Sequence, residues 1–411
     1  MGKNRKPRHL RGGRQPKEVI RTDSLSPPPP LPAELIALIL DKLSEDWNAK
    51  LADLARCALV SSAFLALARE RLYRSIKLGC HDLTLFYEYL LDYPTTRLLE
   101  TLGLQPTVSL LVRKVTIART ELHHGPPLEF APILSATLLL CKNVQELEVP
   151  AGYEGLVLDA KQILAAAEEA LPPMQRLTFN SLDGNGVMWM LLAHLQRQIN
   201  HVVFHDRWPK WPFDVEPDPL PHLALTSLSA FYYSSYRPAI LELIFSSCSS
   251  TLTTLHLGLL PATLPDMGTF PNLRTLTLEI PLGPRKVLFL ASLPTVIKAA
   301  VTLRHLIIDP ATPLTLSNIR TLSSPSPTSL AANLPASLER LHLDSPHFYP
   351  ADLVAIVETA SHMRLREIGV QPYRLHQGER DRRKRPALPT HKEQEEMYRV
   401  CGERGVRVVA L

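Results

Sequence analysis

The hexad LTTLHL at 252–257 is followed by LRTLTL at 273–278 and LRHLII at 303–308. Apolar residues fill positions one, four and six of each hexad, so the fourth and sixth side chains of an extended segment share one face. Further hexads follow the same pattern: VRKVTI (112–117), VQELEV (144–149), MQRLTF (174–179), INHVVF (199–204), LTSLSA (225–230), LERLHL (338–343), LREIGV (365–370) and VRVVAL (406–411). The repetition predicts a series of equivalent strands with their fourth residues, from Val115 to Val409, in a shared core.

The spacing of the hexads leaves room for a helix between most of them. Their fourth residues are 21 positions apart from Leu255 to Leu276 and 41 apart from Ile368 to Val409, by subtraction of residue numbers. Apolar residues return at helical spacing within 159–171, 238–248 and 352–361. A repeated strand, loop and helix predicts a solenoid with parallel strands on one face and helices on the other.

This pattern resembles the leucine-rich-repeat family, with irregular spacing. The family's asparagine or cysteine after the hexad is missing here, because Gly258 follows Leu257 and Glu279 follows Leu278. That residue normally bonds backbone groups of the loop, so its absence leaves the curvature of the repeats open.

A second pattern precedes the hexads, in LPAELIALILDKL at 31–43. Pro32 and Glu34 suit the first turn of a helix, and an apolar stripe follows at helical spacing. Apolar residues at 51–57 and 59–72 predict two more short helices. Three short helices cannot bury two broad apolar faces among themselves, so part of this surface should contact a partner or the next domain.

The stretches LPAELIALILDKL and LARCALVSSAFLALARERLYRSIKL (54–78) together resemble an F-box of the type found in fungal F-box proteins. Two departures are a longer first connection and Phe64 in place of the usual tryptophan. The resemblance implies that these helices bind a Skp-type adaptor through apolar residues: Leu31, Pro32, Leu35, Ile36, Ile39, Leu40, Leu43, Leu59, Val60 and Phe64. An ordinary helical cap on the following domain is the alternative.

The expected organisation is therefore α/β: an N-terminal three-helix F-box followed by an irregular leucine-rich-repeat solenoid. Residues 1–30 form a basic, proline-rich tail that we expect to be disordered. Residues 31–78 are the F-box-like module and 79–411 the repeat domain. The tail and the basic run at 380–385 are candidate nuclear import signals, or solvated segments.

Composition limits the classes of function. The chain has 411 residues, 45% of them hydrophobic, and a net charge of only +5, which argues against a general nucleic-acid binder. Its five cysteines form no CxxC pair, so we expect no disulfide framework and a cytoplasmic or nuclear protein. No apolar run is long enough to span a bilayer, and no membrane partner is expected.

We find no catalytic motif: no phosphate-binding loop, no GxSxG and no HExxH. His201 and His205 fall in or beside a predicted strand and fit polar surface residues better than metal ligands. The chain is therefore expected to be no enzyme and to hold no cofactor and no metal.

Candidate target-binding residues occupy the third and fifth positions of the hexads, which point to the open side. They include Glu146, Glu148, Arg176, His256, Arg340 and His342. Trp208 and Trp211, in a proline-rich loop at 205–221, are candidate interface anchors, although they could pack on the solenoid instead.

The resemblance thus implies a substrate-recognition subunit of a cullin-type (SCF) ubiquitin ligase. It would bind a Skp-type adaptor, through it a cullin, and an unknown protein target. Two alternatives stay open: a non-degradative interaction scaffold, and a chromatin- or nucleic-acid-associated repeat protein that uses the basic segments.

Overall fold

The computed structural model describes the following residues: 31–44, 50–80, 93–119, 130–149, 174–179, 192, 199–206, 222–232, 238–258, 265–280, 285–310, 327–343, 350–359, 362–370 and 390–410. The chain divides into two compact units, Met1–Arg71 and Leu72–Leu411. We describe each unit by itself.

The first unit is helical. Its described elements are α1 (Ala33–Ser44), α2 (Lys50–Cys57) and α3 (Ser62–Arg74), whose last turn crosses into the second unit. Leu40 and Ala68 are fully buried, and Ile36 and Leu54 nearly so. One apolar stripe of α1 therefore forms the core of this unit, as its helical spacing predicts.

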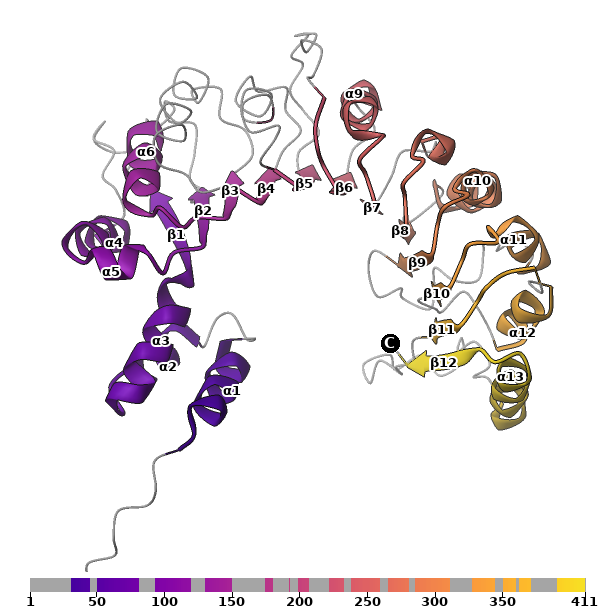
Figure 1. Ribbon diagram of the computed structural model, residues 1–411, viewed down its shortest axis with the longest axis horizontal. Helices are drawn as coiled ribbons and strands as arrows, with labels where there is room; N and C mark the ends of the chain where they lie inside the picture. The colour runs from indigo at the N-terminus through magenta and orange to yellow at the C-terminus, as the bar shows by residue number, and fades with distance from the viewer. Residues whose placement is uncertain are drawn as a thin grey trace, which may run out of the picture. The chain divides into compact units, whose positions relative to one another are not determined.

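The second unit is built on one parallel sheet of twelve strands (Figure 1), in which every strand pairs with its neighbours in sequence order. The strands are β1 (Ser75–Cys80), β2 (Lys114–Arg119), β3 (Glu146–Val149), β4 (Arg176–Phe179), β5 (His201–Asp206), β6 (Ser227–Tyr232), β7 (Thr254–Gly258), β8 (Thr275–Ile280), β9 (His305–Pro310), β10 (Arg340–Leu343), β11 (Glu367–Val370) and β12 (Arg407–Ala410). Sequential parallel pairing is the topology of a solenoid, so the predicted α/β repeat fold is confirmed.

Helices lie along one face of this sheet (Figure 1). Those described are α4 (Tyr93–Leu104), α5 (Pro106–Ser109), α6 (Phe130–Leu140), α9 (Pro238–Cys248), α10 (Arg285–Ala299), α11 (Pro327–Asn333), α12 (Pro350–Thr359) and α13 (His391–Glu403), with a 3₁₀ turn, η1 (Met267–Thr269). We call the opposite face of the sheet, which carries the third and fifth hexad residues, the open face. None of the described helices is long and apolar enough to cross a membrane.

The core follows the hexads closely. Their fourth residues are direct register partners from Val115 on β2 to Ile368 on β11, and each is almost completely buried. The sixth residues, such as Leu257, Leu278 and Ile308, form a second buried row beside them. Because each such side chain contributes about 1.5–3 kcal/mol on burial, these rows are the main stabilising feature of the repeats.

The first strand differs from the expected boundary. Residues 31–78 were assigned to the F-box-like module, yet β1 begins at Ser75 and pairs with β2 along its whole length. Ile76 and Leu78 are buried like the fourth and sixth residues of a hexad. The two compact units separate between Arg71 and Leu72, and α3 ends at Arg74, directly before β1.

The last strand corrects the predicted register by one residue. Val408, and not Val409, is the partner of Ile368. Gly405 has a φ of 69° and closes α13 with two hydrogen bonds: its N–H donates to Gly402, and the N–H of Val406 donates to Cys401. This left-handed helix end buries Val406 and starts the strand at Arg407.

A polar ladder connects successive repeats just before β8, β9 and β10. Asn272 donates to the carbonyl of Ser250 at 2.7 Å, Thr302 to that of Leu273 at 2.9 Å, and Ser337 to that of Leu303 at 2.7 Å. Each donor precedes a hexad and bonds the preceding repeat. The asparagine or cysteine that follows the hexad in leucine-rich repeats is replaced by Gly258 and Glu279 after two of the hexads, whereas this ladder bonds carbonyl groups ahead of the strands.

Candidate protein-binding surfaces

Helix α1 has a second apolar row that the first unit leaves exposed. Leu31, Leu35, Leu38 and Ile39 are 52%, 47%, 56% and 42% exposed, whereas Ile36 and Leu40 are 2% and 0%. Leu35, Leu38 and Ile39 are three and four residues apart on α1, and Leu31 lies just before the helix, so one row faces away from the core. Exposed apolar rows of this kind mark interaction surfaces.

The link between α2 and α3 adds to the exposed apolar residues. Leu59 and Val60 are 87% and 68% exposed. Pro32 is exposed and Phe64 half-buried, while the side chain of Leu43 lies outside the described residues. We call Leu31, Leu35, Leu38, Ile39, Leu59 and Val60 the apolar patch.

The structure thus divides the predicted adaptor-binding residues into two groups. Ile36 and Leu40 pack inside the first unit and are not available to a partner. Leu38 belongs to the exposed row but was not predicted. In the sequence, only its spacing from Leu31 and Leu35 indicates that Leu38 belongs to this row. The spacing alone does not show which apolar stripe of α1 is exposed, because that depends on how α1 packs in the folded unit.

Charged side chains lie on the open face of β2–β4. Lys114 Nζ and Glu148 Oε2 are 3.0 Å apart, and Thr116 donates to the same oxygen at 3.2 Å. Glu146 is the register partner of Lys114 on one side and of Arg176 on the other. The predicted residues Glu146, Glu148 and Arg176 are therefore neighbours, with opposite charges alternating across the strands.

Aromatic and histidine side chains gather further along, on β5–β8. The rings of His205 and Phe231 are stacked, with their centroids 4.8 Å apart. The ring of His256 contacts Phe231 edge to face, with a centroid distance of 4.6 Å. His256 Nε2 lies 3.1 Å from Glu279 Oε1. A Cβ on Gly258 would come within 2.6 Å of Glu279 Oε2 and 2.7 Å of Phe231, so any larger residue there would displace these side chains.

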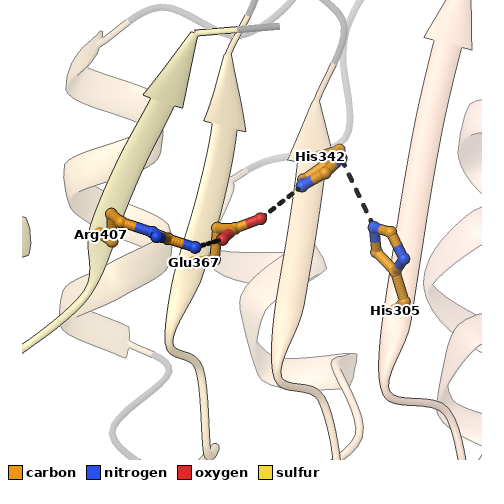
Figure 2. A network of polar contacts seen from close by, with 4 residues as sticks. All are labelled: His305, His342, Glu367 and Arg407. Carbon is orange, nitrogen blue, oxygen red and sulfur yellow. Dashed lines mark hydrogen bonds and ion pairs between the residues drawn. The ribbon is translucent and has the colours of Figure 1, made fainter. Parts of the chain in front are cut away.

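A chain of four polar side chains crosses β9–β12 (Figure 2). His305 Nε2 lies 3.4 Å from His342 Nδ1, and His342 Nε2 lies 3.2 Å from Glu367 Oε1. The second carboxylate oxygen, Oε2, accepts a hydrogen bond from Arg407 Nη2. The side chains thus link residues 305 and 407, which are 102 positions apart in the sequence, across four strands that already pair through their backbones.

The protonation of this chain follows from its partners. Hydrogen bonds from Arg407 and then His342 hold the pKa of Glu367 below its usual range, so it is a carboxylate that only accepts. His342 Nε2 therefore carries a proton, and in the neutral ring Nδ1 accepts from His305 Nε2. Burial is the largest cause that lowers the pKa of His305, and the positive charge of Arg340 adds to it, which favours the neutral form of His305.

His201, the third residue of its hexad on β5, has a strongly lowered pKa. Burial and the charge of Arg176 lower its pKa to about 4. Its Nε2 is buried and has no hydrogen-bond partner within the described parts of the chain. His201 and His205 lie on the same strand, and the described residues contain no group of three or more potential metal ligands.

Several predicted features lie outside the described residues. These are Trp208 and Trp211, the tail at 1–30, the basic run at 380–385 and the helix expected at 159–171. The hexad positions did place His256, Arg340 and His342 on the open face. Sequence reasoning passed over His305 and Glu367, although both are third residues of hexads, and the one-residue register error hid Arg407.

No protein-family model matches the chain, and a comparison with curated proteins gives no match. Among solved structures, a Bacteroides fragilis protein is 9% identical, with a TM-score of 0.35, over 84% of this chain and 76% of that one. The yeast Rad7 and Elc1 complex contains a chain that is 14% identical, with a TM-score of 0.34, over 82% of this chain and 68% of that one. At these TM-scores neither likeness carries an argument about family or function.

Proposed function

We propose that this chain is a substrate-recognition subunit of a cullin-type (SCF) ubiquitin ligase. Its F-box-like helices bind a Skp-type adaptor, and the open face of the repeats binds a protein target. Transfer chemistry belongs to another subunit, and this chain contributes proximity rather than catalytic groups.

The apolar patch is the observation that carries this proposal. Leu35 and Ile39 of α1, Leu31 just before that helix, and Leu59 and Val60 stay exposed although the unit already has a core. These five are residues that the F-box resemblance assigns to adaptor contact. The resemblance also assigns Ile36 and Leu40 to adaptor contact, but both side chains are buried in the core of the unit.

The repeats support the second half of the proposal. Their register places the third and fifth residues of successive hexads side by side on a continuous face. That face alternates charged, small polar and aromatic side chains, as protein-binding surfaces do. A scaffold that binds the adaptor without a cullin has the same surfaces, and co-purification of a cullin distinguishes the two functions.

A capture experiment tests the adaptor contact. The full chain and a Leu31→Ala/Leu35→Ala/Leu59→Ala variant are mixed with immobilised Skp-type adaptor, and bound protein is quantified. The control variant, Leu104→Ala/Leu139→Ala/Val301→Ala, removes three exposed leucine or valine side chains from the second unit. Truncation of three anchors should reduce capture at least a hundredfold, at about 1–2 kcal/mol each, while the control binds like the wild type.

Circular dichroism of each variant checks that the helices remain folded, as expected for exposed positions. Wild-type protein that is not captured, or equal loss in both variants, would refute the adaptor role. Residues 31–78 would then be a helical cap on an interaction protein.

A further inference from the structure

Four side chains form one continuous row on the open face of the last repeats. His305, Arg340, Glu367 and Arg407 are consecutive register partners on β9, β10, β11 and β12. Register partners on neighbouring parallel strands lie about 4.8 Å apart and point to the same face. The row therefore holds two guanidinium groups and one carboxylate within reach of one another.

Glu367 is already engaged by two other partners. Its Oε1 faces His342 Nε2 and its Oε2 accepts from Arg407, and the residue is itself buried. Arg340 stands between His305 and Glu367 in the row and is exposed, and its guanidinium has no hydrogen bond or ion pair to any described residue. Of the two cations in the row, one is neutralised and Arg340 is not.

His305 is the second unsatisfied group. It uses Nε2 as a donor toward His342, which leaves Nδ1 without a hydrogen-bond partner in the part of the chain that the structure describes. The chain Arg407–Glu367–His342–His305 fixes the orientation of this ring (Figure 2). Arg340 is the register partner of His305 on the next strand. Arg340 and His305 thus offer one free cation and one free ring nitrogen at adjacent positions.

We propose that Arg340 and His305 form a site for a side-chain carboxylate in an acidic segment of the target protein. Guanidinium binds carboxylate through paired N–H donors, which suits Arg340. The proposal rests on the proposed function in one respect, that the repeats bind a protein. Glu367 and His342 are positioning residues that hold His305 in place.

The charge of the site selects a carboxylate. The row sums to one net positive charge, from two arginines and one glutamate, because burial favours the neutral form of His305. A carboxylate carries one negative charge, whereas a phosphoryl group carries about −1.5 to −2 at neutral pH. Within the described side chains of the neighbouring open face, Glu279 is already paired with His256, so it does not neutralise Arg340.

Carboxylate binding should draw a proton onto His305. The groups facing it are Thr275 from β8, Arg340 and His342 from β10, and Glu367 more distantly from β11. A bound anion offsets the repulsion from Arg340, and protonated Nδ1 then donates a second hydrogen bond to the ligand. Binding should therefore strengthen as the pH falls from 7.5 to 6.

The test uses fluorescence anisotropy of the full chain with a labelled peptide in which four glutamates alternate with glycines. Probe controls are the same peptide with four glutamines, and one with two phosphoserines at similar net charge. Arg340→Gln should weaken glutamate-peptide binding about fivefold or more, the upper range for an exposed ion pair. Arg364→Gln, which removes an exposed arginine beside β11, should leave it unchanged.

His305→Gln separates the second part of the site. This variant should bind like the wild type at pH 7.5 and lose the strengthening at pH 6. Equal binding by the wild type and Arg340→Gln, equal loss in Arg364→Gln, or equal binding of glutamine peptide would overturn the site. Tighter binding of the phosphoserine peptide would overturn the choice of carboxylate.

Adaptor capture is measured through the apolar patch of the other unit, so the two proposals fail separately. Loss of peptide discrimination with intact capture refutes only the carboxylate site. Loss of capture with intact peptide discrimination refutes only the adaptor role.

Discussion

Arg71 on α3 donates a hydrogen bond from Nε to Oδ1 of Asp41 on α1 over 2.7 Å. The same guanidinium reaches the carbonyl of Ala37, one turn earlier on α1, at 3.3 Å. Its side chain is only 15% exposed, against 59% for Asp41. Arg71 therefore fixes the rotation of α1, and with it the division into a buried stripe and the exposed row of Leu31, Leu35 and Leu38.

Arg71→Met should loosen α1 while keeping the apolar length of the side chain. The variant loses charge-assisted hydrogen bonds in a half-buried setting, worth about 1.5–3 kcal/mol. We expect faster hydrogen–deuterium exchange in 33–44 and weaker adaptor capture. The control Arg69→Met changes an exposed residue two positions away. Unchanged exchange in Arg71→Met, or the same increase in Arg69→Met, would show that Arg71 does not hold this helix.

Ser337→Ala should test the polar ladder between repeats. Ser337 Oγ lies 2.8 Å from the carbonyl of Val301 and 2.7 Å from that of Leu303, in the preceding repeat. Loss of this donor should lower the free energy of unfolding by about 1 kcal/mol, seen as a lower urea midpoint. The control Ser249→Ala removes a 3.4 Å bond to Ser246, three residues earlier. Equal midpoints for wild type and Ser337→Ala would refute a stabilising role.

The repeat fold could be predicted because one pattern carries it. Leu255, Leu276 and Leu306 recur in hexads whose alternation is a local property of the sequence, and stacking follows from the need to bury them. The ladder could not be predicted in this way. Serine and threonine before a hexad have the composition of an ordinary loop, and only the three-dimensional register shows that they face a carbonyl of the previous repeat.

Other features depend on contacts that no local pattern encodes. The register of β12 depends on the left-handed conformation of Gly405. The apolar pattern alone allows either Val408 or Val409 to be the partner of Ile368. The chain from His305 to Arg407 requires four strands in exact order. The sequence does not show that Ile36 and Leu40 belong to the core. Helix α1 is apolar on two faces, and tertiary packing selects the face that is buried.

Stability should fall below pH 6.5 partly through His201. Burial and Arg176 lower its folded-state pKa to about 4, from an ordinary value of 6.5. Between these values the unfolded chain binds a proton at this histidine and the folded chain does not, so stability is present above pH 6.5 and is lost as the pH falls toward 4.

Urea midpoints measured from pH 7 to pH 4.5 check this effect. Between pH 7 and pH 4.5 the free energy of unfolding should fall less in His201→Gln than in the wild type. The difference should reach up to about 3 kcal/mol at pH 4.5. His391→Gln is the matched control, since that exposed histidine lies 3.2 Å from Glu395 on the surface of α13. Parallel curves for wild type and His201→Gln would mean that His201 titrates normally in the folded protein.

Two glycines at the end of α13 should respond oppositely to the same substitution. Gly405 has a φ of 69°, a conformation that alanine adopts only at a cost of about 1 kcal/mol. Gly402 lies within the helix and a Cβ there would meet nothing within 4 Å, so alanine should stabilise by about 0.5–1 kcal/mol. The urea midpoint of Gly402→Ala should be higher than that of the wild type, and the midpoint of Gly405→Ala should be lower. Faster hydrogen exchange at 407–410 should accompany only Gly405→Ala, because the left-handed turn sets the register of β12 on Glu367 and Ile368. If both variants moved stability in the same direction, the turn would not be what fixes that register.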